Sequence, residues 1–132
     1  MTEIHLIDAS GSMLGCEEEI DEYLQQCDED DVVITTVYVG GHSWEDCVTI
    51  EVLSDEGEQV DSTDIEYNGP TPIAKTTNMV KEIMGPSDSL TVVTDGYPTY
   101  VEDFIECVND DNIHVEFIGD GPWPEVEEGI NA

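Results

Sequence analysis

LIDASGSMLG, residues 6–15, is an apolar run that stops at Asp8 and continues with two serines and two glycines. The apolar residues before Asp8 predict a short buried strand over residues 4–8. Ser10 and Ser12 follow on a glycine-containing turn, so several oxygen atoms gather at the carboxyl end of that strand. Open α/β sheets bind their ligands at this end, and the stretch therefore predicts both a fold class and the place of a site.

The rest of the chain alternates apolar strands with amphipathic helices. We expect further strands over residues 32–40, 47–53, 89–96 and 113–121, and helices over residues 14–27, 72–84 and 99–109. The second and third strands, joined by GGHSWED, are expected to form an antiparallel hairpin at one edge of the sheet. This order predicts a single domain over residues 1–132, a three-layer α/β/α Rossmann-like sandwich with a mostly parallel sheet and one antiparallel edge strand.

The chain carries 33 acidic residues against two lysines, for a net charge of −31. One net charge falls on about 220 Å² of surface, a mean spacing of about 15 Å against a Debye length of about 8 Å. Three explanations stay open: a surface suited to a salty or crowded host, mimicry of a nucleic-acid phosphate array, and buffering of divalent ions. Direct nucleic-acid binding is disfavoured, because the chain cannot neutralise phosphates.

The cysteines and histidines do not form a recognisable motif. The cysteines are spaced too widely for a zinc knuckle or a redox pair, and we interpret them as small buried thiols: Cys16, Cys27, Cys47 and Cys107. The histidines are expected to be structural or surface residues: His5, His42 and His114. No signal-peptide pattern and no run of 18 apolar residues is present, so we expect a cytoplasmic protein without membrane association. For a virus-encoded chain this would be the host cytoplasm.

Further oxygen donors are predicted at the same edge of the sheet as Asp8. Asp95 closes the strand over residues 89–96, and Thr71 precedes the next helix amino terminus along the chain. Two carboxylates and three hydroxyls are hard ligands that suit Mg²⁺, with Mn²⁺ or Ca²⁺ as alternatives. The candidate metal ligands are Asp8, Ser10, Ser12, Thr71 and Asp95.

Three short motifs resemble those of von Willebrand factor A (VWA) domains. DASGSM at 8–13 resembles their Asp-x-Ser-x-Ser signature, GPTPIA at 69–74 their Gly-Gly-Thr-Pro-Leu segment, and VVTDGYP at 92–98 their strand-ending Thr-Asp-Gly. The resemblance implies a metal-ion-dependent adhesion site, in which a partner's carboxylate completes the metal shell. It implies direct metal ligation by Ser10, Ser12 and Thr71, and ligation mostly through water by Asp8 and Asp95. Because the chain is shorter than typical members of the family, we expect it to be truncated after the fifth strand.

The favoured hypothesis is a non-catalytic, Mg²⁺-dependent protein-binding module, with a protein partner such as an ATPase or an assembly factor. Tyr97 and Trp123 follow predicted strand ends beside the site and are candidates for a partner-binding rim. The alternative is a virus-encoded acidic decoy, a nucleic-acid mimic that uses the fold as a scaffold. A metal-assisted phosphohydrolase is disfavoured. The haloacid-dehalogenase phosphatases also have an aspartate at the end of the first strand, but they need a second aspartate two positions on, where this chain has Ser10. ASGSM also differs from the Gly-x-Ser-x-Gly elbow of serine hydrolases, so we do not expect an enzyme.

Overall fold

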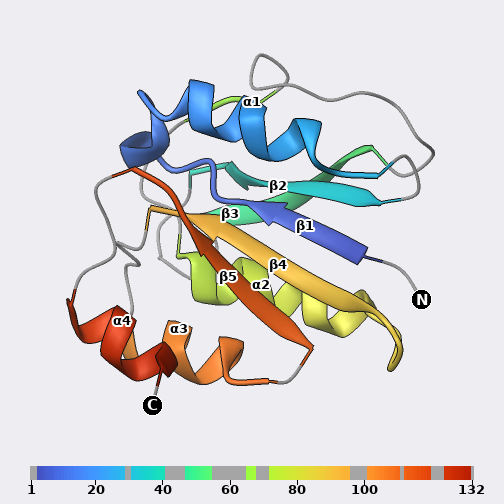
Figure 1. Cartoon of the computed structure of the whole chain (residues 1–132), viewed down its shortest axis with the longest axis vertical. Coiled ribbons are helices and arrows are strands. Elements are labelled where there is room, and N and C mark those ends of the chain that lie inside the picture. The colour runs from blue at the N-terminus through green and yellow to red at the C-terminus, as the bar shows by residue number, and fades with distance from the viewer. Residues whose placement is uncertain are drawn as a thin grey trace.

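The computed structural model describes residues 3–28, 31–40, 47–54, 65–67, 72–95, 101–110, 112–119 and 124–131, which form a five-stranded sheet between two layers of helices (Figure 1). The strands are β1 (Glu3–Ile7), β2 (Val32–Tyr38), β3 (Val48–Ser54), β4 (Ser89–Thr94) and β5 (Ile113–Phe117). The helices are α1 (Glu17–Gln25), α2 (Ile73–Ile83), α3 (Val101–Val108) and α4 (Pro124–Asn131), with a short 3₁₀ helix, η1 (Gly11–Met13). None of these described helices is long and apolar enough to span a membrane.

The sheet has the strand order β3-β2-β1-β4-β5, so β1 lies at its centre. β1 runs parallel to β2 and β4, and β4 runs parallel to β5. Of the five described strands, only β3 is antiparallel to its neighbour, and it pairs with β2 at one edge. The predicted fold class, a mostly parallel sheet with one antiparallel edge strand, is confirmed.

Helices cover both faces of the sheet, which explains the continuous apolar runs of the parallel strands. α1 lies on one face, and α2, α3 and α4 lie on the other (Figure 1). Because neighbouring side chains of a strand point to opposite faces, Leu6 packs in the core beneath the three helices and Ile7 in the core beneath α1. Both side chains are fully buried.

The helices are amphipathic, as the sequence predicts, and their apolar sides face the two cores. In α1, Ile20 and Leu24 are buried, and Cys16, Tyr23 and Cys27 pack beside them. The remaining helices contribute Ile73, Val80 and Phe104 to the opposite core. None of the four cysteines forms a disulfide: Cys47 and Cys107 are buried, whereas Cys16 and Cys27 are half-buried.

Two local predictions are wrong. The helix predicted to begin at residue 14 begins at Glu17, because Gly15 has a φ of 104°, a left-handed conformation that cannot continue a right-handed helix. The sequence analysis also placed no element after the fifth strand, but α4 follows it. Val126 of α4 is fully buried, and Gly129 allows a close approach to Ile105 of α3, where a Cβ would collide with that side chain.

Candidate metal site

Two aspartates lie together at the carboxyl end of the central strands. β1 and β4 pair in the register Ile7↔Val93, and the backbone N–H of Asp8 donates to the carbonyl oxygen of Val93 over 2.9 Å. Asp95 directly follows β4, so the two carboxylates emerge from neighbouring strand ends. Asp8 is only 4% exposed and Asp95 only 3%. Both carboxylates therefore lie below the surface of this edge.

Local hydrogen bonds fix the orientation of the Asp8 side chain. The backbone N–H of Ser10 donates to Asp8 Oδ1 over 3.0 Å, and the Thr94 hydroxyl donates to Asp8 Oδ2 over 2.7 Å. The next peptide is fixed as well, because the N–H of Ala9 donates to Thr36 Oγ1 in β2 over 2.8 Å. Three neighbouring strands thus position one carboxylate.

Burial shifts the ionisation of this carboxylate. Loss of hydration raises the pKa of Asp8 above its ordinary value of 3.8, and the nearby charge of Asp95 raises it further. The hydrogen bonds from Thr94 and Ser10 lower the pKa but do not cancel the effect of burial. Ionising Asp8 at this buried position beside Asp95 is costly, and a divalent cation would offset that cost. The donor set therefore fits a metal ion.

The structure describes part of the predicted ligand set. Asp8, Ser10 and Asp95 are buried at the same edge, and we call these three residues the carboxylate edge. Ser12 lies in η1, directly beyond Ser10, but its side chain is not among those described. Three further predicted site residues lie outside the described residues: Thr71, Tyr97 and Trp123.

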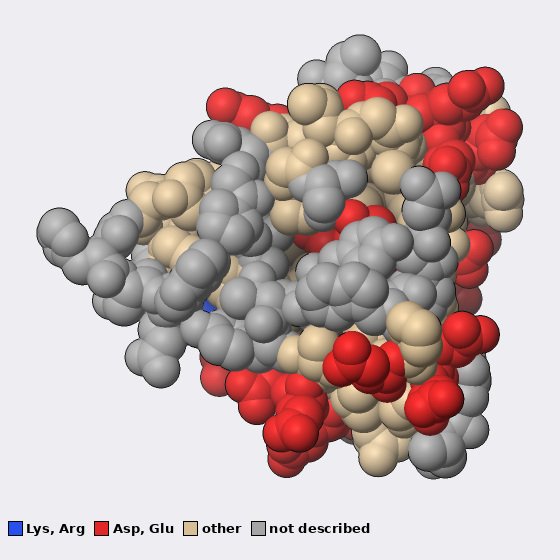
Figure 2. All heavy atoms as spheres, turned by 90° about the vertical axis from the view of Figure 1, so that its left-hand side faces the viewer, with Lys and Arg blue, Asp and Glu red and all other residues tan. Residues whose placement is uncertain are grey.

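Acidic groups surround the carboxylate edge on a larger scale. Figure 2 looks onto this side of the molecule, toward the carboxyl ends of the parallel strands. Acidic atoms appear around the face and near its middle, with almost no lysine visible. Such a surface raises the local concentration of cations.

The start of α1 is tied to the same edge by the end of β5. The backbone N–H of Gly119 donates to Glu19 Oε2 over 2.8 Å. Gly119 has a φ of 72°, and a Cβ there would lie 3.1 Å from the Sγ of Cys16. Glycine is required here both by its left-handed backbone and by the close approach of α1.

A second buried polar group, which the sequence analysis missed, lies beneath the other end of α1. His5 Nε2 lies 2.8 Å from Asp31 Oδ2, and His5 Nδ1 lies 2.6 Å from the hydroxyl of Tyr23. The thiol of Cys27 lies beside them. We call these four residues the His5 cluster. Its members are distant in sequence, and the one available signal was a histidine inside an apolar strand.

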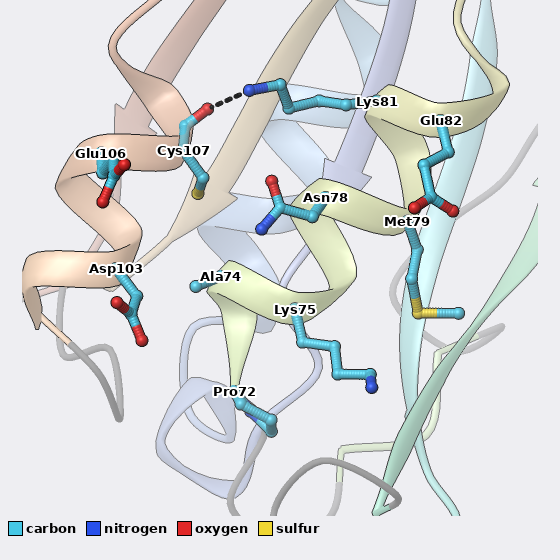
Figure 3. Close-up of a pocket in the computed structure, with 10 residues that line it drawn as sticks. All are labelled: Pro72, Ala74, Lys75, Asn78, Met79, Lys81, Glu82, Asp103, Glu106 and Cys107. Atoms are coloured by element: carbon cyan, nitrogen blue, oxygen red, sulfur yellow. Dashed lines mark hydrogen bonds between the residues drawn. The ribbon is translucent and has the colours of Figure 1, made fainter.

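The groove between α2 and α3 contains both lysines of the chain (Figure 3). Lys81 Nζ donates to the carbonyl oxygen of Cys107 over 3.0 Å, at the carboxyl end of α3. A cation at this position satisfies a terminal carbonyl and interacts favourably with the helix dipole. No member of the carboxylate edge lines this groove, and we interpret it as a seam of helix packing.

No protein-family model matches the sequence, and no curated protein matches it significantly. Five chains of solved structures do match. One is a von Willebrand factor type A from Catenulispora acidiphila, at 15% identity and a TM-score of 0.56, covering 98% of this chain and 35% of that one. Another is the manganese-loaded Plasmodium vivax TRAP protein, at 15% identity and a TM-score of 0.58, covering 98% of this chain and 61% of that one.

This chain has the VWA fold. The resemblance inferred from the three sequence motifs is confirmed at the level of the fold, and the likeness extends over nearly the whole chain. This chain spans only 35% and 61% of the lengths of the two solved proteins. At 15% identity the likeness shows the fold alone.

Proposed function

We propose that this VWA-type chain is a non-catalytic protein-binding module that holds Mg²⁺ at the carboxylate edge and binds a carboxylate of its partner through that ion. The observation that carries the proposal is the buried pair Asp8 and Asp95, at the ends of neighbouring strands. Burial raises the pKa of Asp8, so the ionised pair gains from a cation. A manganese-loaded solved protein of the same fold supports a divalent ion as the ligand.

The proposed ligands are hydroxyls and carboxylates, as the sequence motifs imply. Asp8, Ser10 and Asp95 would hold the ion together with Ser12 and Thr71. When bound, Mg²⁺ keeps exchangeable water and Lewis acidity, which allows an external carboxylate to enter its shell. Tyr97 and Trp123 are proposed as rim contacts for the protein that supplies this carboxylate.

Metal titration tests the site itself. Calorimetry with Mg²⁺ or Mn²⁺ should show one saturable site in the wild type that Asp8→Asn removes. Glu106→Gln is the matched control, because Glu106 is an exposed acidic residue of α3 outside the carboxylate edge. Equal loss of binding in both variants would mean that the acidic surface as a whole binds the ions.

Partner binding tests the function. Proteins captured from the native host by the immobilised chain should be released by a chelator and should fail to bind Thr71→Ala. If a chelator released the partner but Thr71→Ala bound it normally, the prediction that Thr71 is a metal ligand would be contradicted.

The net charge of −31 favours a second candidate function, an acidic decoy that mimics nucleic acid. Such a decoy binds a basic partner by charge over a broad surface, so its complex dissociates as salt rises. Partners that resist chelator and Thr71→Ala but are released by salt would support the decoy and contradict metal-bridged binding.

A further inference from the structure

The His5 cluster brings three different metal-ligating side chains together from three parts of the chain. His5 lies in β1, Cys27 just beyond α1, and Asp31 just before β2. One ligand atom from each of these residues lies within 4.8 Å of the other two. His5 and Asp31 are buried, and Cys27 is half-buried. The cluster joins the middle of β1 to the residue before β2, whereas the carboxylate edge follows the carboxyl ends of β1 and β4.

The donor atoms of the two regions select different ions. The carboxylate edge offers oxygen alone, which suits hard ions such as Mg²⁺. The His5 cluster offers one sulfur, one imidazole nitrogen and one carboxylate oxygen. Thiolate and imidazole together favour borderline-soft ions, and Zn²⁺ is bound by this combination in tetrahedral sites.

Hydrogen bonds already orient two of the three ligands. The hydroxyl of Tyr23 lies 2.6 Å from His5 Nδ1, the ring nitrogen that a metal on Nε2 would leave free. The backbone N–H of Asp28 donates to Asp31 Oδ2 over 3.1 Å. Outer partners of this kind fix the tautomer of a ligating histidine and the direction of a ligating carboxylate.

We propose that the His5 cluster is a second metal site, which binds Zn²⁺ or a similar transition-metal ion through His5 Nε2, the Cys27 thiolate and an Asp31 carboxylate oxygen. Three protein ligands leave the fourth tetrahedral position for water. The site is independent of Mg²⁺ binding at the carboxylate edge, because the two regions share no ligand.

The geometric adjustment required is small. Ligand atoms around tetrahedral zinc lie about 3.3–3.8 Å apart, given bonds of about 2.0–2.3 Å. His5 Nε2 and Asp31 Oδ2, now 2.8 Å apart, would separate slightly, and Cys27 Sγ would approach them. Cys27 and Asp31 both lie outside regular helix and strand, so their side chains can shift without breaking a ladder hydrogen bond.

The charges around the thiol also favour a cation. Burial, followed by the negative charges of Asp31, Asp28 and Glu3, raises the pKa of Cys27 to about 11. Without metal the thiol therefore keeps its proton at neutral pH. On binding, the S–H bond breaks, the zinc–sulfur bond forms and the proton leaves to solvent. A metal on Nε2 would replace the hydrogen that this nitrogen shares with Asp31, and the ring proton would move to Nδ1, where the Tyr23 hydroxyl can accept it.

Cobalt titration of the full chain tests the proposal, with excess Mg²⁺ present to saturate the acidic surface and the carboxylate edge. Co²⁺ in a tetrahedral thiolate site gives a near-ultraviolet sulfur-to-metal absorption band. The wild type should show this band with one equivalent of Co²⁺, and Zn²⁺ should abolish it by displacement. Cys27→Ser should remove the band and weaken Zn²⁺ binding at least about 100-fold.

Cys16→Ser is the matched control, because Cys16 is also half-buried and also adjoins α1. It should keep both the band and the Zn²⁺ affinity. His5→Gln provides a second variant, with folding of each protein checked by circular dichroism. The proposal is overturned by Co²⁺ saturation without the band, by a band that survives Cys27→Ser, or by binding that requires two chains per ion.

Discussion

The carboxylate edge lies at the carboxyl end of the central strand β1, whereas the His5 cluster extends from the middle of β1 toward the start of β2, and the two regions balance buried charge differently. At the carboxylate edge two acidic groups adjoin each other, and burial raises the pKa of Asp8 despite its hydrogen bonds. In the His5 cluster an acidic group faces an imidazole, and both ring nitrogens of His5 have partners. The first region therefore gains most from an external cation, because its hydrogen bonds leave two acidic groups side by side, whereas in the second region the carboxylate faces a hydrogen-bonded imidazole.

The comparison teaches how each region depends on its surroundings. A like-charged pair remains costly until a cation arrives, so its contribution to stability should depend strongly on metal concentration. A satisfied hydrogen-bond network contributes in either condition, and removing one member leaves the others buried without a partner. Five predictions test this difference, from the largest expected effect to the smallest.

Asp8→Asn should reverse its effect on stability when Mg²⁺ is added. Without metal at pH 7 the variant should be at least as stable as the wild type, because it removes a buried charge. At an Mg²⁺ concentration about 100 times the dissociation constant, the wild type alone should gain about 2.7 kcal/mol. Thermal melts with chelator and with Mg²⁺ measure both values.

The pH dependence of the same variant follows from the raised pKa of Asp8. In the metal-free wild type, the Asp8 carboxyl should contribute most to the free energy of unfolding below about pH 3.8. That contribution should be lost as the pH rises through the raised folded-state pKa of Asp8. Asp8→Asn should lack this loss. If Asp8→Asn were less stable than the wild type by the same amount with chelator and with Mg²⁺, the predicted reversal of its effect on stability would be contradicted.

Tyr23→Phe should destabilise the protein by about 1–3 kcal/mol with or without Mg²⁺, because it leaves His5 Nδ1 buried without a partner. Urea denaturation gives the free energy of unfolding. Tyr38→Phe is the matched control, because Tyr38 is 37% exposed and its hydroxyl can reach water, so its cost should be near zero. Similar costs for the two variants would show that the His5 cluster contributes little.

Thr94→Val should cost about 1 kcal/mol and weaken Mg²⁺ binding about tenfold, because Asp8 Oδ2 loses the hydroxyl that orients it. Thr94→Ser retains the hydroxyl and should keep most of the affinity. Calorimetric titration of the pair measures the effect. Equal Mg²⁺ affinities of Thr94→Val and Thr94→Ser would mean that the Thr94 hydroxyl does not position the Asp8 carboxylate.

Lys81→Gln should cost only about 0.5 kcal/mol, through the lost interaction with the end of α3, and should leave metal binding unchanged in both regions. Lys75→Gln is the control, since Lys75 is exposed on the same helix. A change in Mg²⁺ or Co²⁺ affinity in Lys81→Gln would show that the groove is coupled to a metal region.

Much of the fold was predictable because the parallel strands are buried on both faces. Their apolar runs identified β1 and β4, and the helical spacing of Ile73 and Val80 identified α2. The start of α1 was misplaced because apolar spacing cannot report the left-handed backbone of Gly15. α4 was missed because its short sequence has few apolar residues, and its place depends on the close contact of Gly129 with α3.

The carboxylate edge and the His5 cluster also differ in how far local sequence patterns could predict them. Asp8 and Ser10 are two residues apart, and Asp95 ends a recognisable strand, so local patterns located the described part of the carboxylate edge. The ligation roles of these residues remain predictions. The His5 cluster was missed because 26 residues separate His5 from Asp31. Residues 28–31 lie between the helix predicted over residues 14–27 and the strand predicted from residue 32, and no local pattern pairs them with β1.

The central position of β1 also determines when the carboxylate edge can form during synthesis. The hydrogen bond between Thr94 and Asp8 joins residues 86 positions apart, and β1 pairs with β4 along its whole length. At translation rates of about 5–20 residues per second, Asp8 waits roughly 4–17 seconds before Thr94 is made. During that interval the apolar first strand lacks one of its two neighbours. If the proposed metal ion binds at this edge, its capture becomes possible only after the nascent chain has extended through β4, although Asp8 is synthesised near the start of the chain.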